Sequence, residues 1–535
     1  MSEPDLTNVA ANDSSMPAAP AADVLRSEFR RNMGHISRQS ITYFAGTLFT
    51  MLAGYLVKIY VARVLGAENL GLYALGMTLV TLTQLVGCVG LQGAAPRYVA
   101  IYNGSGRWDD LRSFLTRSVA IVLGLNLVFS VVLLLAGRWI SQHLYHAPSL
   151  APYIPVFAVL TVLGSLTVFY GQILAGYKDV AKRTVITHFV GSSLVIPLTV
   201  ILLALGRGMW GYLAAQLVNS TVVLVLLIAV AWRLTPAPAR LSRAPLPPLD
   251  PEIKGFAAAS LGMGALDFLV SQADKVLLGF YLNPKLVGIY VIASSLSALI
   301  PIILQSVNQI FAPVIADLHA KRKQVVLGKL FQTLTKWVVA LTLPLAFVII
   351  IFAVPLLRIF GTGFVAGWPV LVIGAAGQLV NCGVGSVGYL LLMSGNQKRL
   401  MRVQFVMAGV SVLVNLFLIP VLGIVGAAIA AVSVNIAGNL WNLLEVRKAL
   451  GISPYNRSYY SLVAPATAAA ACVVALRLWQ GLVSHSWLAV LVALSLSYLT
   501  FGAVALKCAL DEDDRMIATS AWAQLRAGLR IGAKA

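Results

Sequence analysis

Four charged residues of this chain lie inside long apolar stretches, where a charge is costly. They are two lysines, Lys58 and Lys275, and two aspartates, Asp267 and Asp274. A charge near the centre of a bilayer costs at least about 2.5 kcal/mol on insertion scales, so such residues are candidates for function by default. The lysines could bind an anionic group such as a phosphate. The aspartates, which share one helical face, could take up a proton or Na⁺ as ion-coupling groups.

Three amides and two arginines extend this set. Gln92 and Gln309 each precede a proline by four residues near a predicted helix end, and Asn308 lies beside Gln309. A proline frees the carbonyl group four residues earlier, so each segment could bend and expose backbone to a polar path. We therefore include these amides, together with Arg63 and Arg97, among the candidate substrate-binding residues.

Each charged candidate also has a structural interpretation. Lys58 is close to the end of its predicted helix and could extend its amine to the membrane surface. Asp274 and Lys275 could pair with a neighbouring helix, and Arg97 could anchor the inner end of a helix. Asp267 lies deepest in its helix, where a structural interpretation is weakest. The sequence leaves these alternatives open.

The segment that contains Lys58 occurs twice in the chain. A shift of 217 residues places residues 58–98 on residues 275–315 with nine of 41 positions identical. The identical positions include the two lysines, a Gly-x-Tyr motif and the two Gln-x-x-x-Pro motifs. This pattern indicates an internal duplication.

The amino-acid composition predicts that the chain is embedded in a membrane. The chain has 535 residues, of which 59% are hydrophobic and 11% charged, and its mean hydropathy is +0.85. Such a chain has too few polar groups to cover a soluble globule. Apolar runs of about 20 residues are long enough to cross a bilayer as helices. We therefore predict an all-α membrane protein with about 14 transmembrane helices.

The charges predict its orientation. The net charge is +20, but the 39 lysines and arginines concentrate in the two tails and in alternate loops, while the intervening loops have at most one each. This distribution follows the positive-inside rule, so we expect both termini in the cytoplasm and no binding of nucleic acid.

The repeat and the loops divide the chain into two parallel six-helix lobes, which share an orientation because six is even. Two C-terminal helices have no repeat partner. The predicted domains are a disordered cytoplasmic tail (1–37), an N-lobe with helices 1–6 (38–235), a proline-rich cytoplasmic linker (236–252), a C-lobe with helices 7–12 (253–450), helices 13 and 14 (451–510), and a cytoplasmic tail (511–535).

Common cofactor motifs are absent from the sequence. No Walker A motif or glycine-rich nucleotide loop occurs, so we expect neither ATP nor another cofactor. His143 and His146 have no cysteine or carboxylate partners nearby in the sequence, and the four cysteines lack a C-x-x-C spacing. We therefore predict no metal site. Because the predicted external loops are short and lightly charged, we also do not expect an enzyme.

Several motifs resemble one family of membrane transporters. They are the hairpin of residues 62–73, the run Asp-Lys-Val-Leu-Leu-Gly at 274–279, and the segments 359–371 and 415–428. These residues resemble the polysaccharide transporter branch of the multidrug/oligosaccharidyl-lipid/polysaccharide flippase superfamily. The resemblance covers roughly residues 38–450.

The resemblance implies a flippase of the bacterial inner membrane. Such proteins move polyprenyl-pyrophosphate-linked oligosaccharides for O-antigen, capsule or exopolysaccharide synthesis by alternating access. Membrane lipid and the lipid-linked glycan would be its partners, together with a polysaccharide polymerase or chain-length regulator. The lysines and amides suit such a glycolipid better than a cationic drug. An ion-coupled multidrug exporter and a membrane-embedded polymerase or ligase are the alternatives.

Overall fold

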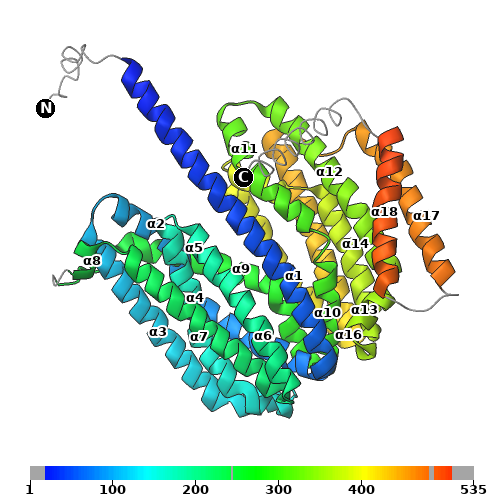
Figure 1. The fold of residues 1–535 in the computed structure, drawn as a ribbon, viewed down its shortest axis with the longest axis horizontal. Helices are drawn as coiled ribbons and strands as arrows, with labels where there is room; N and C mark the ends of the chain where they lie inside the picture. The colour runs from blue at the N-terminus through cyan, green and yellow to red at the C-terminus, as the bar shows by residue number, and fades with distance from the viewer. Residues whose placement is uncertain (1–17, 242–244, 481–486, 509–535) are drawn as a thin grey trace, which may run out of the picture.

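The computed structural model describes residues 18–241, 245–480 and 487–508. The regular elements of these residues are helices, and Figure 1 shows them in two groups, with α1 (Ala18–Gly87) running diagonally between the groups. Residues 1–17 and the predicted tail 511–535 lie outside the described residues.

The first group follows the chain as far as the proline-rich linker. A π-helical turn, Val185–Val190, joins its helices α5 and α6. After α1, the helices of this group are α2 (Leu91–Gly104), α3 (Trp108–Trp139), α4 (Ile154–Gly176), α5 (Val180–Thr184), α6 (Gly191–Ala204), α7 (Gly208–Leu234) and the short α8 (Ala237–Leu241).

The second group contains the rest of the described chain. Its last two helices lie at the outer edge of the group, beside α12 and α13 (Figure 1). In order, the helices are α9 (Pro251–Tyr281), α10 (Pro284–Ser297), α11 (Ile302–Ala320), α12 (Gln324–Ile351), α13 (Ala353–Phe360), α14 (Trp368–Val384), α15 (Val387–Met393), α16 (Gln397–Leu450), α17 (Val463–Gln480) and α18 (Trp487–Cys508).

Eleven helices of the described chain are long and apolar enough to cross a membrane. The number is 12 when α10 and the start of α11, which meet at an angle of 53°, are counted as one broken span. The prediction of an all-α, multi-pass membrane protein is therefore confirmed. Two of these helices contain a non-helical glycine: α1 at Gly66 and the 54-residue α16 at Gly423.

The first helix begins earlier than we expected. The sequence suggested a disordered tail up to residue 37, whereas α1 begins at Ala18. Residues 18–37 include four alanines and three arginines, which are strong helix formers, and these residues favour the extension.

In the second group, α9 begins at Pro251, where the Asp250 carboxylate accepts a hydrogen bond from the Glu252 amide at the helix start.

A break interrupts the repeated segment in each half, but not at the predicted proline. Pro96 and Pro313 lie inside α2 and α11. The chain leaves helical geometry earlier, at residues 88–90 between α1 and α2 and at residues 298–301 between α10 and α11. In the first break, Val89 and Gly90 have positive φ angles, which a right-handed helix does not admit.

The proline-rich linker lies against the first group. Its residues 245–250 have no helical structure. Ser113 donates a hydrogen bond to the carbonyl oxygen of Pro247, and Arg117 donates one of 2.8 Å to the carbonyl oxygen of Leu246. Both donors belong to α3, so the linker is held along this helix before the chain enters α9.

The two copies of the repeated segment cross at a pair of glycines. A β-carbon on Gly71 of α1 would overlap the carbonyl oxygen of Pro284, and one on Gly288 of α10 would overlap the carbonyl oxygen of Ala67. Gly71 matches Gly288 and Ala67 matches Pro284 under the 217-residue shift. The copies therefore make a symmetrical contact of backbone on backbone, which we call the glycine crossing.

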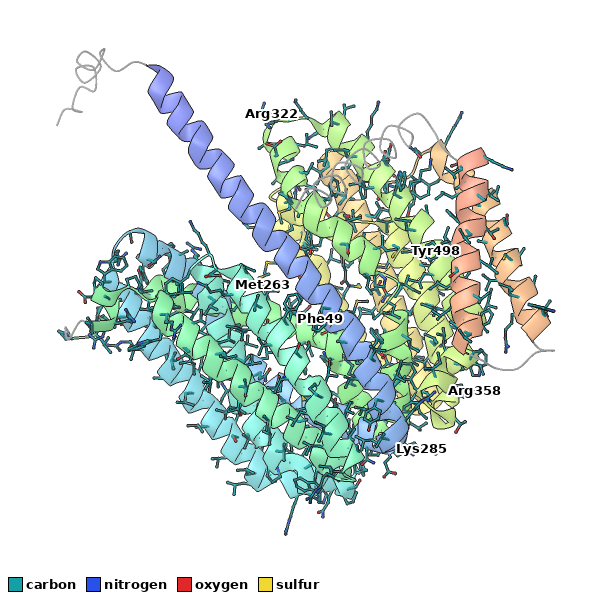
Figure 2. The ribbon with its side chains drawn as sticks, in the orientation of Figure 1. Phe49, Met263, Lys285, Arg322, Arg358 and Tyr498 are labelled. Carbon is teal, nitrogen blue, oxygen red and sulfur yellow. The ribbon has the colours of Figure 1, made fainter. Side chains whose placement is uncertain are left out.

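The crossing lies toward one end of the molecule. Figure 2 shows Lys285 and Arg358 at this end and Arg322 at the opposite end. Lys285 and Arg358 belong to loops predicted to be external, and Arg322 belongs to a loop predicted to be cytoplasmic. We refer to the two ends as the Lys285 end and the Arg322 end.

Candidate functional site

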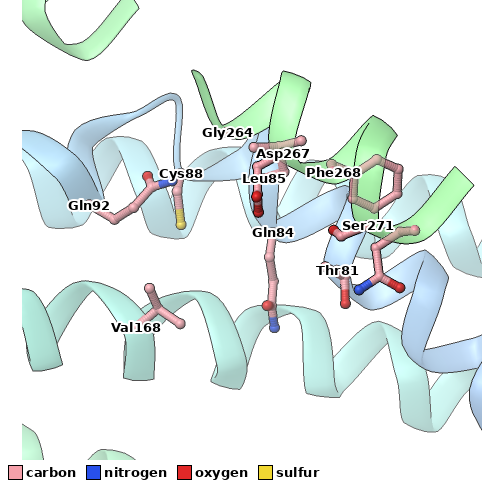
Figure 3. Close-up of a pocket in the computed structure, with 11 residues that line it drawn as sticks. Thr81, Gln84, Leu85, Cys88, Gln92, Val168, Gly264, Asp267, Phe268 and Ser271 are labelled. Atoms are coloured by element: carbon pink, nitrogen blue, oxygen red, sulfur yellow. The ribbon is translucent and has the colours of Figure 1, made fainter. Parts of the chain in front are cut away.

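A cavity of about 260 Å³ with both polar and apolar walls lies where α9 meets α1, α2 and α4. Figure 3 shows side chains from these four helices around it. Its walls carry hydroxyl, amide and carboxylate groups between apolar side chains. The lining residues are Thr81, Gln84, Leu85, Cys88, Gln92, Val168, Gly264, Asp267, Phe268, Ser271 and Gln272.

Two of the predicted site residues line this cavity. Asp267 of α9 is exposed there and accepts no hydrogen bond from any described residue. Gln92 of α2 is partly buried, and its side-chain oxygen lacks a hydrogen-bond partner among the described residues. A carboxylate and an unsatisfied amide oxygen at one cavity wall are available for a ligand or for water.

Helix α9 forms the boundary between the two groups of helices. It runs antiparallel to α1 and α2, because Gly279 contacts Leu75 at one end and Ala257 contacts Gly90 near the other. On its opposite side, the Leu269 carbonyl accepts a hydrogen bond from Ser411 of α16. The cavity on α9 is therefore positioned between the two halves of the chain.

The two repeat-related lysines lie on the packed helices α1 and α9. The amine of Lys275 donates a 2.7 Å hydrogen bond to Gln272, which lines the cavity. The amine of Lys58 lies 5.1 Å from the ring centroid of Tyr55. Tyr55 donates a hydrogen bond to the Ser295 carbonyl of α10, so the two halves of the chain are in contact here.

Asp274 does not share the environment of Asp267. Its carboxylate accepts hydrogen bonds from the Tyr290 hydroxyl of α10 and, at 2.8 Å, from the Lys275 backbone amide. The seven-residue spacing led us to expect both aspartates on one face with one role. In the structure Asp274 links α9 to α10, whereas Asp267 is exposed in the cavity, so the two carboxylates have different surroundings.

The two predicted arginines lie outside the cavity. At the Lys285 end, Arg63 donates a 2.7 Å hydrogen bond to the carbonyl oxygen of Ile359. At the start of α9, Arg97 forms a 2.9 Å ion pair with Glu252 and lies 5.0 Å from the ring centroid of Phe256. Each arginine joins the two halves of the chain, and neither reaches the cavity.

The two predicted polar residues of α11 are also separate from the cavity. Asn308 is buried, and its side-chain oxygen has no hydrogen-bond partner among the described residues. Gln309 is exposed. The matching motif of the first half, which contains Gln92, does reach the cavity, so the repeat partners occupy different environments.

The histidines predicted not to bind metal have aromatic neighbours. His143 stacks on Trp139, with ring centroids 5.8 Å apart, and His146 lies edge-on to Phe280 at 6.1 Å. Within residues 18–241, 245–480 and 487–508, no group of three or more histidine, cysteine, aspartate or glutamate residues could hold a metal ion.

Sequence reasoning missed three residues of this region. Tyr290 contacts Asp274, Tyr55 lies beside Lys58, and Gln272 connects Lys275 to the cavity. Tyr290 had a signal, because it is one of the identical positions of the repeat, matching Tyr73. Gln272 lies three residues before Lys275 and could have been found by helical spacing.

Comparison with protein families identifies the chain. The family model described as "Polysaccharide biosynthesis protein" matches residues 36–319, which is more than half of the sequence. The chain belongs to this family. It is similar to "Probable flippase AglR" of Haloferax volcanii, with 24% identity over 437 residues, covering 79% of this chain and 86% of the relative. "Probable low-salt glycan biosynthesis flippase Agl15" of the same organism is 22% identical over 400 residues, covering 74% and 80%.

Two solved structures have folds similar to the fold of this chain. The lipid II flippase MurJ in an inward closed conformation superposes with a TM-score of 0.70 at 13% identity, covering 87% of this chain and 99% of MurJ. An inward-facing MATE-family multidrug resistance transporter of the MOP superfamily gives a TM-score of 0.58 at 14% identity, covering 77% and 98%. This chain therefore shares its fold with these two proteins.

The different surroundings of the aspartates predict different effects on stability. Tyr290→Phe removes a donor to the partly buried Asp274 carboxylate, so we expect a loss of about 1–3 kcal/mol. Asp267→Asn should change stability by no more than about 0.5 kcal/mol, because the Asp267 side chain has no described partner. Thermal unfolding of the purified variants in detergent measures both effects. A larger loss in Asp267→Asn than in Tyr290→Phe would contradict these assignments.

Proposed function

We propose that this protein is a flippase for a polyprenyl-pyrophosphate-linked oligosaccharide that serves cell-surface polysaccharide synthesis. The observation that carries the proposal is the placement of Lys58 and Lys275, matching positions of the repeat, on the packed helices α1 and α9, with Lys275 joined to the cavity through Gln272. Membership of the polysaccharide biosynthesis family and the flippase names of two relatives support it.

The electrostatics of the lysine pair favour a pyrophosphate. Two like charges held near each other in a membrane protein repel more strongly than they would in water. An anion with two or more negative charges offsets both lysines at once and forms charge-assisted hydrogen bonds with them. The pyrophosphate of a lipid-linked glycan has this charge and carries the sugar on one side and the lipid on the other.

The same pair disfavours the alternative of a multidrug exporter for cationic drugs. A cationic drug would be repelled by the two amines, and Asp267 is the carboxylate that lines the cavity. The cavity walls otherwise supply neutral amide and hydroxyl groups, which suit an uncharged sugar.

The proposed transport cycle is alternating access between two six-helix lobes. With α10 and the start of α11 counted as one span, the described chain has 12 apolar helices. Helices α1 and α16 each contain a non-helical glycine and would each contribute two spans, so we infer 14 spans. The Lys285 end would face outward and the Arg322 end inward, with both termini in the cytoplasm of a bacterial inner membrane. A polymerase or chain-length regulator would receive the glycan on the outer side.

Substitution of the lysines tests this function. We expect Lys58→Ala and Lys275→Ala each to lower glycan export at least about tenfold, because each removes a charged contact to the pyrophosphate. Lys285→Ala, at the start of α10, is the control and should export normally. The measurement is the amount of surface glycan and of retained lipid-linked glycan in cells that express each variant at equal membrane levels. Normal export by both lysine variants would contradict the proposed site.

We further propose that Asp267 couples transport to an ion gradient, since a carboxylate that is reachable from the cavity can bind a proton or Na⁺ in one conformation and release it in another. Asp267→Asn should abolish the dependence of transport on the gradient, while Asp274→Asn should keep it. Transport into proteoliposomes with an imposed proton or Na⁺ gradient distinguishes the two variants. Unchanged gradient dependence in Asp267→Asn would exclude this residue as the coupling group.

A further inference from the structure

A second polar cluster lies in the second half of the chain, on α14 and α16. It contains four carboxamides, those of Gln378, Asn381, Asn435 and Asn439. Asn439 donates to Asn381 at 3.0 Å and to Asn435 at 2.8 Å, and Asn381 donates to Gln378 at 3.1 Å. None of the four lines the cavity of Figure 3. The hydrogen bonds fix the orientation of the four amides relative to one another.

Asn435 is exposed on the side of α16 that faces the interior of the helix bundle. Two contacts define the packed faces of this segment: Val432 touches Gly377 of α14, and Gly438 touches Met407 of the preceding segment of α16. At 100° per residue, Asn435 projects between these faces and points about 180° away from the exposed Leu444. Its exposure therefore indicates open space inside the bundle, away from the lipid-facing surface.

The position along the helix places this open space at mid-membrane depth. Asn435 is midway between the break at Gly423 and Arg447 near the helix end, about 18 Å from each at 1.5 Å per residue. An amide at this depth is costly against lipid and is found where it contacts protein or a polar path. If the amides served only to hold α14 and α16 together, the hydrogen bond between Asn381 and Asn439 would be enough. That structural role would not require Asn435 to be exposed.

The chemistry of the cluster suits sugar hydroxyl groups. Each carboxamide presents both donors and an acceptor and carries no charge, which matches a hydroxyl that donates and accepts. The Asn435 amide nitrogen donates to no described residue, while its oxygen is held by Asn439. A neutral cluster has little to attract a pyrophosphate and nothing to attract a lipid chain.

We propose that these four amides form a glycan subsite in the second half of the chain, which binds hydroxyl groups of the sugar while the lysine pair binds the pyrophosphate. The inference rests on the proposed function and assigns to this cluster the recognition of the glycan. Asn435 is the contact residue, and Asn439 positions it.

The test is binding of two related lipids to the purified full-length protein. The first probe is the pyrophosphate-linked glycan lipid extracted from cells depleted of this protein, and the second is the same extract after mild acid has released the glycan. We expect the wild type to bind the intact lipid on the order of tenfold more tightly, as two ordinary hydrogen bonds would give. Asn435→Ala should remove this preference and leave the affinity for the acid-treated lipid unchanged.

Two further variants separate recognition from structure. Asn439→Ala should reduce the preference for the intact lipid, and Asn439→Gln should restore part of it. Asn415→Ala is the control, because this buried amide donates to the Ser411 carbonyl of its own helix and should keep the full preference. If Asn435→Ala still preferred the intact lipid, the proposed glycan subsite would be wrong but the proposed function would stand. Failure of the wild type to bind either lipid would overturn the proposed function as well.

Discussion

The glycine crossing is the contact on which the rest of the structure depends. At Gly71 and Gly288 the two copies of the repeat touch through backbone atoms, and even a methyl group at either position would collide with a carbonyl oxygen of the other copy. Lys58 and Lys275 each precede their glycine by 13 residues. A symmetrical crossing therefore brings the two lysines toward one another, although they are 217 residues apart in sequence.

The two copies have diverged around this shared contact. Just before the copies begin, the 217-residue shift places Asp267 and Asp274 on Thr50 and Val57 of the first half, and Thr50 lies 3.0 Å from the His188 ring nitrogen. Between these matched positions, only the second half has a carboxylate at the cavity and a carboxylate–tyrosine link between α9 and α10. In our account, the lysines bind the anion with contributions from both halves, while ion coupling and glycan recognition belong to the second half.

The sequence predicted the membrane class because hydropathy reflects burial directly, and its internal similarity indicated the duplication and made Lys58 and Lys275 matching positions. It could not separate Asp267 from Asp274, since a seven-residue spacing fixes the helical face but not which neighbouring helix supplies a hydroxyl. Arg63 and Arg97 were chosen for charge alone, and their partners, the Ile359 carbonyl and Glu252, come from segments remote in sequence. The extension of α1 to Ala18 was missed because a polar composition was taken as disorder.

The central structural claim is that the backbone contact at Gly71 and Gly288 holds the two copies of the repeat together at the Lys285 end. Its most direct test is the rate at which a water-soluble maleimide labels a cysteine at the buried position Leu70, in protein that lacks its four native cysteines. We expect slow labelling of Leu70→Cys alone, and labelling at least about tenfold faster when Gly288→Ala forces the copies apart. Gly54→Ala, where a β-carbon meets nothing within 4 Å, is the matched control and should leave the rate unchanged. Equal labelling rates in all three proteins would contradict the account.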